Sequence, residues 1–136
     1  MSKTVPLFIS VSPGNPRSIT QQICDGIRIS IASGQLPVGA QLPSVRGLAQ
    51  QLTINPKTVA KAYGELANEG WLDARQGMGL FVAAPRQLLS EAERERRLAL
   101  AIEAFSSEVI GLGYPLEQIL DRVSATLTPC LNKKPA

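Results

Sequence analysis

The sequence predicts a mainly α-helical protein with a small β-ribbon: a winged helix-turn-helix followed by an α-helical hairpin. Three observations predict this fold class. Residues Leu42–Tyr63 have the pattern of two short amphipathic helices joined by a tight turn. Two strand-like runs follow, joined by the glycine-containing turn Gln76–Gly79. Beyond Pro85, apolar side chains recur at helical spacing in two runs, which Gly111 and Gly113 separate.

The charge distribution supports a division into two domains, a winged helix over residues 1–84 and a two-helix dimerisation tail over 85–136. Residues 1–83 contain 7 Lys and Arg against 4 Asp and Glu, whereas residues 84–136 contain 7 of each kind. The positive excess therefore belongs to the expected winged helix, as a surface facing DNA phosphates requires.

Several classes of function are excluded by what the sequence lacks. It contains no His, which removes imidazole zinc ligands and the commonest general base, and it has no nucleophile motif. We therefore expect no enzyme, no metal site and no cofactor. No run approaches the ~20 apolar residues of a membrane span, and no signal peptide is visible, so we expect a cytoplasmic protein with no membrane partner. Cys24 and Cys130 fit a reducing compartment as free thiols, although a disulfide between them stays open.

The first helix is expected from about Pro16 to Ser33. Its buried stripe is expected to contain Ile19, Ile23, Ile27 and Ile31. Gly34 suits the left-handed position that ends a helix. In the connection that follows, we expect Leu36 and Val38 to contact the core.

The helix-turn-helix carries two capping signals. Ser44 suits the N-cap of its first helix, and Asn55 suits the N-cap of its second helix, with Pro56 at the first helical position. The outward face of the second helix carries Lys57, Thr58 and Lys61. A helix-turn-helix presents its second helix to the DNA major groove in this way. The alternative is an ordinary helical hairpin with a solvated polar face.

The tail has two amphipathic runs. A helix beginning at Ser90 carries an apolar seam at gaps of four and three residues, namely Leu98, Ile102, Phe105, Val109 and Leu112. A last helix after Pro115 carries Leu116, Ile119, Leu120, Val123 and Leu127 on one face. Two helices leave much apolar surface uncovered, and a second subunit is the expected cover. The alternative is that the hairpin folds back on its own winged helix.

The run GQLPVGAQLPSVRGLAQQLTINPKTVAKAYGELANEGWLDARQGMGLFV, residues Gly34–Val82, resembles the DNA-binding domain of the GntR family of bacterial transcription regulators. The short two-helix tail and the run NPKTVAKAY are similar to the YtrA-type subgroup, in which such a hairpin serves dimerisation. The resemblance implies a winged helix that binds double-stranded DNA. Gly47 departs from the family pattern, which usually has a charged residue there, and we have no functional account of it.

Matching positions imply roles in DNA binding for the residues of the first two helices. Arg46 is expected to reach the major groove, where a guanidinium can bind O6 and N7 of guanine; the alternatives are a phosphate contact or an ion pair with Glu65 or Glu69. Ser44 is expected to contact a phosphate as well as to cap its helix. Asn55 is expected to read a base edge, unless capping alone explains it.

The resemblance also assigns roles to the rest of the recognition helix and to the wing. Lys57, Thr58 and Lys61 lie where the family's recognition helix meets DNA. The hydroxyl of Tyr63 is expected to reach a phosphate, with its ring half in the core. Gln76 and Gly77 match the wing tip that approaches the minor groove, and Arg75 is expected to contact a phosphate.

The sequence therefore predicts a sequence-specific transcriptional regulator, in particular a repressor, that binds a palindromic operator as a homodimer. We expect a small-molecule effector of unknown identity to release it, bound at the dimer interface or between tail and winged helix. The alternative is a winged helix used only for protein–protein contact.

Overall fold

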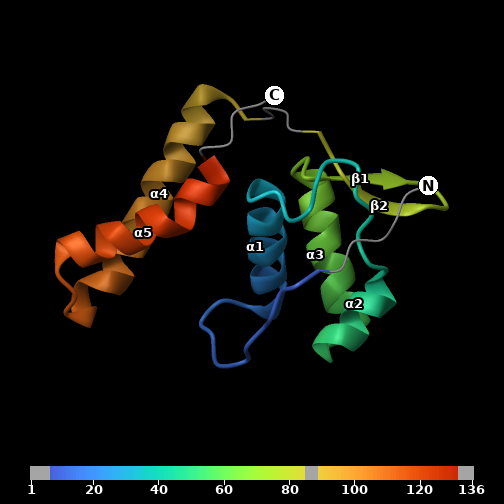
Figure 1. Ribbon diagram of the computed structural model, residues 1–136, viewed down its shortest axis with the longest axis horizontal. Coiled ribbons are helices and arrows are strands. Elements are labelled where there is room, and N and C mark those ends of the chain that lie inside the picture. The colour runs from blue at the N-terminus through green and yellow to red at the C-terminus, as the bar shows by residue number, and fades with distance from the viewer. Residues whose placement is uncertain (1–6, 85–88, 132–136) are drawn as a thin grey trace. The chain divides into compact units, whose positions relative to one another are not determined.

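The computed structural model describes residues 7–84 and 89–131 of the chain. The chain divides into two compact units, Met1–Arg86 and Gln87–Ala136. The first unit contains α1 (Ile19–Ala32), α2 (Val45–Leu52), α3 (Pro56–Asn68), β1 (Leu72–Arg75) and β2 (Gly79–Val82) (Figure 1). The second contains α4 (Glu91–Val109), the 3-10 helix η1 (Ile110–Leu112) and α5 (Leu116–Leu131). Three helices followed by a two-stranded ribbon form the winged helix that the sequence predicts.

Helix α1 begins at Ile19, later than the expected start at Pro16. Ser18 forms a capping box with Gln21: the Gln21 amide donates to the Ser18 hydroxyl, and the Ser18 amide donates to the Gln21 side chain, both at 3.1 Å. This pair of bonds satisfies amide donors of the first turn, so the helix starts after Ser18. At the other end, Gly34 has a φ of +89°, the left-handed conformation expected there.

Helix α3 is the centre of the first unit, because it packs on α1, α2 and β1 (Figure 1). Its inward residues Val59, Ala62 and Leu66 are fully buried, as predicted. Leu36 is also buried, but Val38 is 58% exposed, which contradicts the expectation that it contacts the core. The amide of Ala40 donates to the carbonyl of Pro37, so Val38 occupies the centre of a tight turn and faces solvent.

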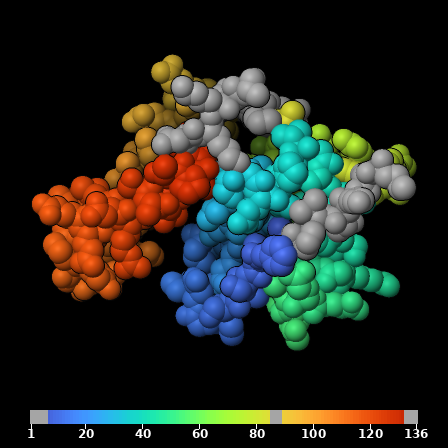
Figure 2. Space-filling model, viewed as in Figure 1, coloured from blue at the N-terminus to red at the C-terminus, as the bar shows by residue number. Residues whose placement is uncertain are grey.

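The N-terminal segment forms a strap along the helices of the first unit. Leu7 is buried, and its carbonyl accepts a hydrogen bond from the side chain of Gln51 in α2 at 2.6 Å. Ile9 lies against α1 at Gly26, where an added Cβ would be only 2.7 Å from the Ile9 Cγ2 atom. Figure 2 shows this dark blue segment at the surface between α1 and α2. Because Gly26 has no side chain, Ile9 of the strap can pack directly against the backbone of α1.

The wing is an antiparallel ribbon in which Leu72 pairs with Val82 and Arg75 pairs with Gly79. Its turn is closed by the Met78 amide, which donates to the Arg75 carbonyl at 2.9 Å. Both strand positions agree with the sequence pattern to within one residue at each end. Residues 39–42 run alongside β2, since backbone hydrogen bonds join them to both Leu80 and Val82.

The second unit has the predicted helices, but they do not pack closely on each other. Ser90 caps α4, and Gly113, with a φ of +81°, turns the chain between η1 and α5. Helices α4 and α5 make few contacts with each other, and no residue described in either helix is buried. The connectivity of a hairpin is therefore present, but the two helices leave an open apolar groove between them. No helix in the described part of the chain is long and apolar enough to cross a membrane.

Candidate DNA-binding surface

The N-terminus of α2 presents Ser44 and Arg46. The hydroxyl of Ser44 accepts a hydrogen bond from the Gly47 amide at 2.9 Å, which confirms its capping role. Arg46 is exposed, and within residues 7–84 and 89–131 no carboxylate pairs with it. Glu69, one of its expected alternative partners, instead pairs with Arg28 at 3.0 Å. The Arg46 guanidinium is thus available to an external partner.

The Ser44 cap gives a steric reason for glycine at position 47. A Cβ at this position would lie 3.0 Å from the Ser44 hydroxyl oxygen. That distance is shorter than an ordinary van der Waals contact, so a larger residue would push the capping hydroxyl away from the amide it accepts from.

The N-terminus of α3 follows the C-terminal end of α2 after the turn at residues 53–55. The side-chain oxygen of Asn55 accepts from the Lys57 amide at 2.8 Å, and Pro56 occupies the first turn. Arg46 and Asn55 line the same shallow hollow, together with Thr53, which turns the chain between the helices in a left-handed conformation. The positive end of the α3 dipole is therefore presented beside the exposed Arg46, an arrangement that favours anions such as DNA phosphates.

Basic residues extend this surface along α3. Lys57 and Lys61 are exposed, and Thr58 between them is partly buried. The opposite side of the helix carries the buried residues Val59 and Ala62, so α3 presents its polar stripe outward and its apolar stripe inward.

The three wing residues expected to contact DNA have different surroundings. Gln76 and Gly77 are exposed in the turn. Arg75 lies over the ring of Phe81, with its guanidinium carbon 4.1 Å from the ring centre, in a cation–π contact that covers a fully buried phenyl ring. Its guanidinium is therefore held against the ribbon, where its edge stays exposed.

Tyr63 is buried more deeply than its expected half-core position. Its side chain is only 3% exposed, and its hydroxyl donates to the carbonyl of Pro43 at 2.9 Å. Burial raises the pKa of Tyr63. The hydroxyl is used internally to join α3 to the segment that leads into α2, so the expected phosphate contact would compete with this bond.

Two residues near the wing were not indicated by the sequence pattern. The side-chain amide of Gln41 donates to the carbonyl of Met78 at 2.7 Å, and the Met78 side chain is 57% exposed at the turn. Hydrophobic periodicity does not mark Gln41, because its partner lies 37 positions away along the chain. The paired glycines around Met78 were the available signal that this turn has a special backbone.

Comparison with known proteins identifies the family. The family model described as bacterial regulatory proteins, gntR family, matches residues 19–82. The chain is 30% identical over 107 residues to the uncharacterized HTH-type transcriptional regulator YhcF of Bacillus subtilis, covering 79% of this chain and 88% of YhcF. It is 36% identical over 76 residues to the HTH-type transcriptional repressor YtrA of Bacillus subtilis, covering 56% of this chain and 58% of YtrA.

Other relatives differ in length. The chain is 37% identical to the HTH-type pyridoxine biosynthesis transcriptional regulator PdxR of Corynebacterium glutamicum, but spans only 20% of that protein and 67% of its own length. The solved structure of YtrA from Sulfolobus acidocaldarius, a GntR-family transcription factor, is 32% identical with a TM-score of 0.59, and the match covers 72% of this chain and 97% of that one. The chain therefore belongs to the gntR family of bacterial regulatory proteins, and it is a YtrA-like transcription regulator with a winged-helix DNA-binding domain.

Proposed function

We propose that this regulator is a homodimeric repressor that binds an inverted-repeat operator. The observation that carries the proposal is the hollow between α2 and the N-terminus of α3, which Arg46 and Asn55 both line, together with the exposed Lys57 and Lys61 on α3. An arginine that pairs with no carboxylate among the described residues, beside the N-terminus of α3, suits the phosphate backbone and the base edges of DNA.

The residues divide by the kind of contact that each makes. Arg46 reads a guanine through its two parallel donors, and Asn55 reads a neighbouring base edge from the hollow. The other contacts are positional and go to phosphates or to the minor groove: Ser44, Lys57, Thr58, Lys61, Arg75, Gln76 and Gly77. Tyr63 does not belong to this set because its hydroxyl is internal.

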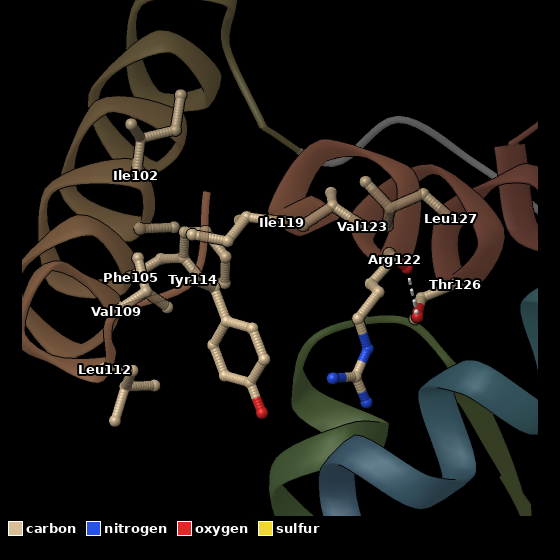
Figure 3. Close-up of a pocket in the computed structure, with 11 residues that line it drawn as sticks. Ile102, Phe105, Val109, Leu112, Tyr114, Ile119, Arg122, Val123, Thr126 and Leu127 are labelled. Carbon is tan, nitrogen blue, oxygen red and sulfur yellow. Dashed lines mark hydrogen bonds between the residues drawn. The ribbon is translucent and has the colours of Figure 1, made fainter. Parts of the chain in front are cut away.

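The proposed dimer forms through the groove between α4 and α5. This groove has a volume of about 550 Å³ and an almost wholly apolar lining that includes Ile102, Phe105, Val109, Ile119, Val123 and Leu127. Figure 3 shows these side chains facing the same space from both helices. Phe105 is 43% exposed within its own chain, so the groove offers a second copy apolar surface to bury.

The remaining residues of the predicted seam extend the apolar surface. Leu112 also lines the groove, whereas Leu98, Leu116 and Leu120 lie outside it and are more than half exposed. A two-fold dimer matches an operator of two inverted half-sites, about 34–36 Å or a multiple of that apart. The repressor role is supported by the name of the relative YtrA, which is an HTH-type transcriptional repressor.

Fluorescence anisotropy tests the proposal. Purified protein first selects duplexes from a random pool, and its binding to the enriched duplex is then compared with a scrambled duplex across a salt series. We expect two protomers per enriched duplex and about 10- to 100-fold weaker binding by Arg46→Ala, because a bidentate guanine contact is lost. Arg94→Ala is the matched control, since Arg94 is also an exposed arginine without an ion pair in the described residues.

Two outcomes contradict the proposal in different ways. Equal and equally salt-sensitive binding to enriched and scrambled duplexes means that phosphate contacts alone hold the protein, and no specific operator is read. No binding to either duplex, even at low salt, favours the alternative of a winged helix used for protein–protein contact.

A further inference from the structure

The wing turn is connected to the helix-turn-helix by one side chain. Gln41 donates from its side-chain amide to the carbonyl of Met78, at 2.7 Å, at the turn of the ribbon. Gly79 follows directly, and a Cβ there would lie 3.2 Å from the same Gln41 nitrogen. The glycine, with a φ of +107°, therefore leaves room for the glutamine as well as allowing the turn.

The backbone on either side of Gln41 is hydrogen-bonded to strand β2. The amide of Leu42 donates to the carbonyl of Leu80, and the amide of Val82 donates to the carbonyl of Ala40, each at 2.9 Å. The segment 39–42 thus runs antiparallel to β2 through an isolated bridge between Gln41 and Phe81, and the Gln41 side chain extends this contact to the turn itself.

The same segment leads directly into the helices that carry the candidate DNA contacts. Pro43 follows Leu42, and its carbonyl accepts from the Tyr63 hydroxyl of α3. Ser44 comes next and caps α2. The segment from Gln41 to Ser44 is therefore hydrogen-bonded to the wing turn at one end and to α3 and α2 at the other.

We propose that Gln41 is a positioning residue, which fixes the wing turn relative to α2 and α3 so that wing and helices approach DNA as one rigid unit. This inference rests on the proposed function. A two-stranded ribbon has little stability of its own, and the tip beyond its last strand pair has the fewest contacts to hold it. Gln41 supplies a contact at that tip, and it acts on DNA through the wing.

The first test measures the wing without DNA. Hydrogen–deuterium exchange of the Met78 amide reports closure of the turn, and Gln41→Leu removes the donor at similar size. We expect exchange at Met78 to rise about fivefold, the effect of losing one hydrogen bond, with the core amide of Leu66 unchanged. Gln35→Leu is the matched control, because Gln35 is exposed and its side chain bonds to no described residue.

The second test uses the enriched duplex and a double-mutant cycle. We expect Gln41→Leu to bind about fivefold more weakly, and to add little to the loss caused by the wing variant Gln76→Ala, because both changes act through the wing. Unchanged Met78 exchange, unchanged affinity, or losses that simply multiply would each overturn the positioning role. If the wild-type protein binds no duplex, the proposed function fails, and the exchange result alone then decides whether Gln41 holds the wing.

Discussion

The role of a single polar residue in this protein depends on whether its polar group faces solvent or is hydrogen-bonded inside the fold. Arg46 and Tyr63 both match family positions. The Arg46 guanidinium is exposed and pairs with no carboxylate in the described part of the chain, whereas the Tyr63 hydroxyl is used inside the fold. An exposed polar group can exchange its water for DNA at little cost, whereas a buried one must first break the bond that satisfies it. Substitution of Arg46 should therefore weaken DNA binding, whereas removal of the Tyr63 hydroxyl should lower the stability of the fold.

Tyr63→Phe removes the hydroxyl that the Pro43 carbonyl accepts from. We expect the free energy of unfolding to fall by about 1 kcal/mol, because one buried hydrogen bond is lost, while affinity for the enriched duplex stays unchanged. Urea denaturation and anisotropy measure the two quantities. Reduced affinity at unchanged stability would return the hydroxyl to the DNA surface.

Alkaline pH provides a second test at this scale, through Cys24. Burial, and then its hydrogen bond to Glu65, raise the pKa of the Cys24 thiol from 9.0 to about 11. The thiol ionises more readily in the unfolded chain, so its contribution to stability is complete below pH 9 and is lost as the pH rises toward 11. Burial raises the pKa of Tyr63 as well, which acts in the same direction.

We therefore expect the free energy of unfolding to stay level around pH 8 and to fall between about pH 9 and 11. Urea denaturation at a series of pH values measures this fall, and Cys24→Ala should show a shallower one. An equally steep fall in Cys24→Ala would mean that the thiol does not contribute to it.

Helices of the first unit are held by caps and by glycines that permit close approach. Gly26 in α1 and Gly64 in α3 are both helical glycines, but their surroundings differ. Ile9 of the strap lies against Gly26, whereas nothing lies within 4 Å of a Cβ added at Gly64. The same substitution should therefore have opposite effects in the two helices.

Gly64→Ala should raise the free energy of unfolding by up to about 1 kcal/mol, because alanine is the better helix former. Gly26→Ala gains the same propensity but must displace Ile9, at a cost of about 1–3 kcal/mol, so we expect a net loss of about 1 kcal/mol. Thermal and urea denaturation compare the two variants. Stabilisation by Gly26→Ala would show that the strap moves aside without cost.

Assembly of the whole molecule is proposed to depend on the second unit, where α4 and α5 leave apolar side chains exposed. Ile102 and Leu100 both lie on α4 with similar exposure, 55% and 51%. Only Ile102 lines the groove between α4 and α5. The pair therefore separates a general effect of charge on this helix from a specific effect on the groove.

Ile102→Lys should convert the proposed dimer into a monomer at micromolar concentration, because a lysine would be buried without a partner in the apolar groove. Leu100→Lys should leave the dimer intact. Analytical ultracentrifugation distinguishes the two states. A wild-type protein that sediments as a monomer would favour the tail folding back on its own winged helix, and equal disruption by both variants would place the interface elsewhere on α4.

The sequence by itself determined the elements and the family. Ser44 and Asn55 cap the helices that they were expected to cap, and Ser90 caps the helix that was expected to begin at that residue. Gly34 and Gly113 take left-handed conformations where the helices end. These features were predictable because caps, turns and apolar stripes depend on residues within a few positions of one another.

The tertiary structure decided what no local pattern contains. It buried the Tyr63 hydroxyl, exposed Val38, joined Gln41 to Met78 and left α4 and α5 apart around an apolar groove. Each of these features joins or separates residues distant in the chain, and it depends on how whole elements pack. The same amphipathic pattern is satisfied by a close hairpin or by a groove that a second chain fills, so periodicity alone cannot choose between them.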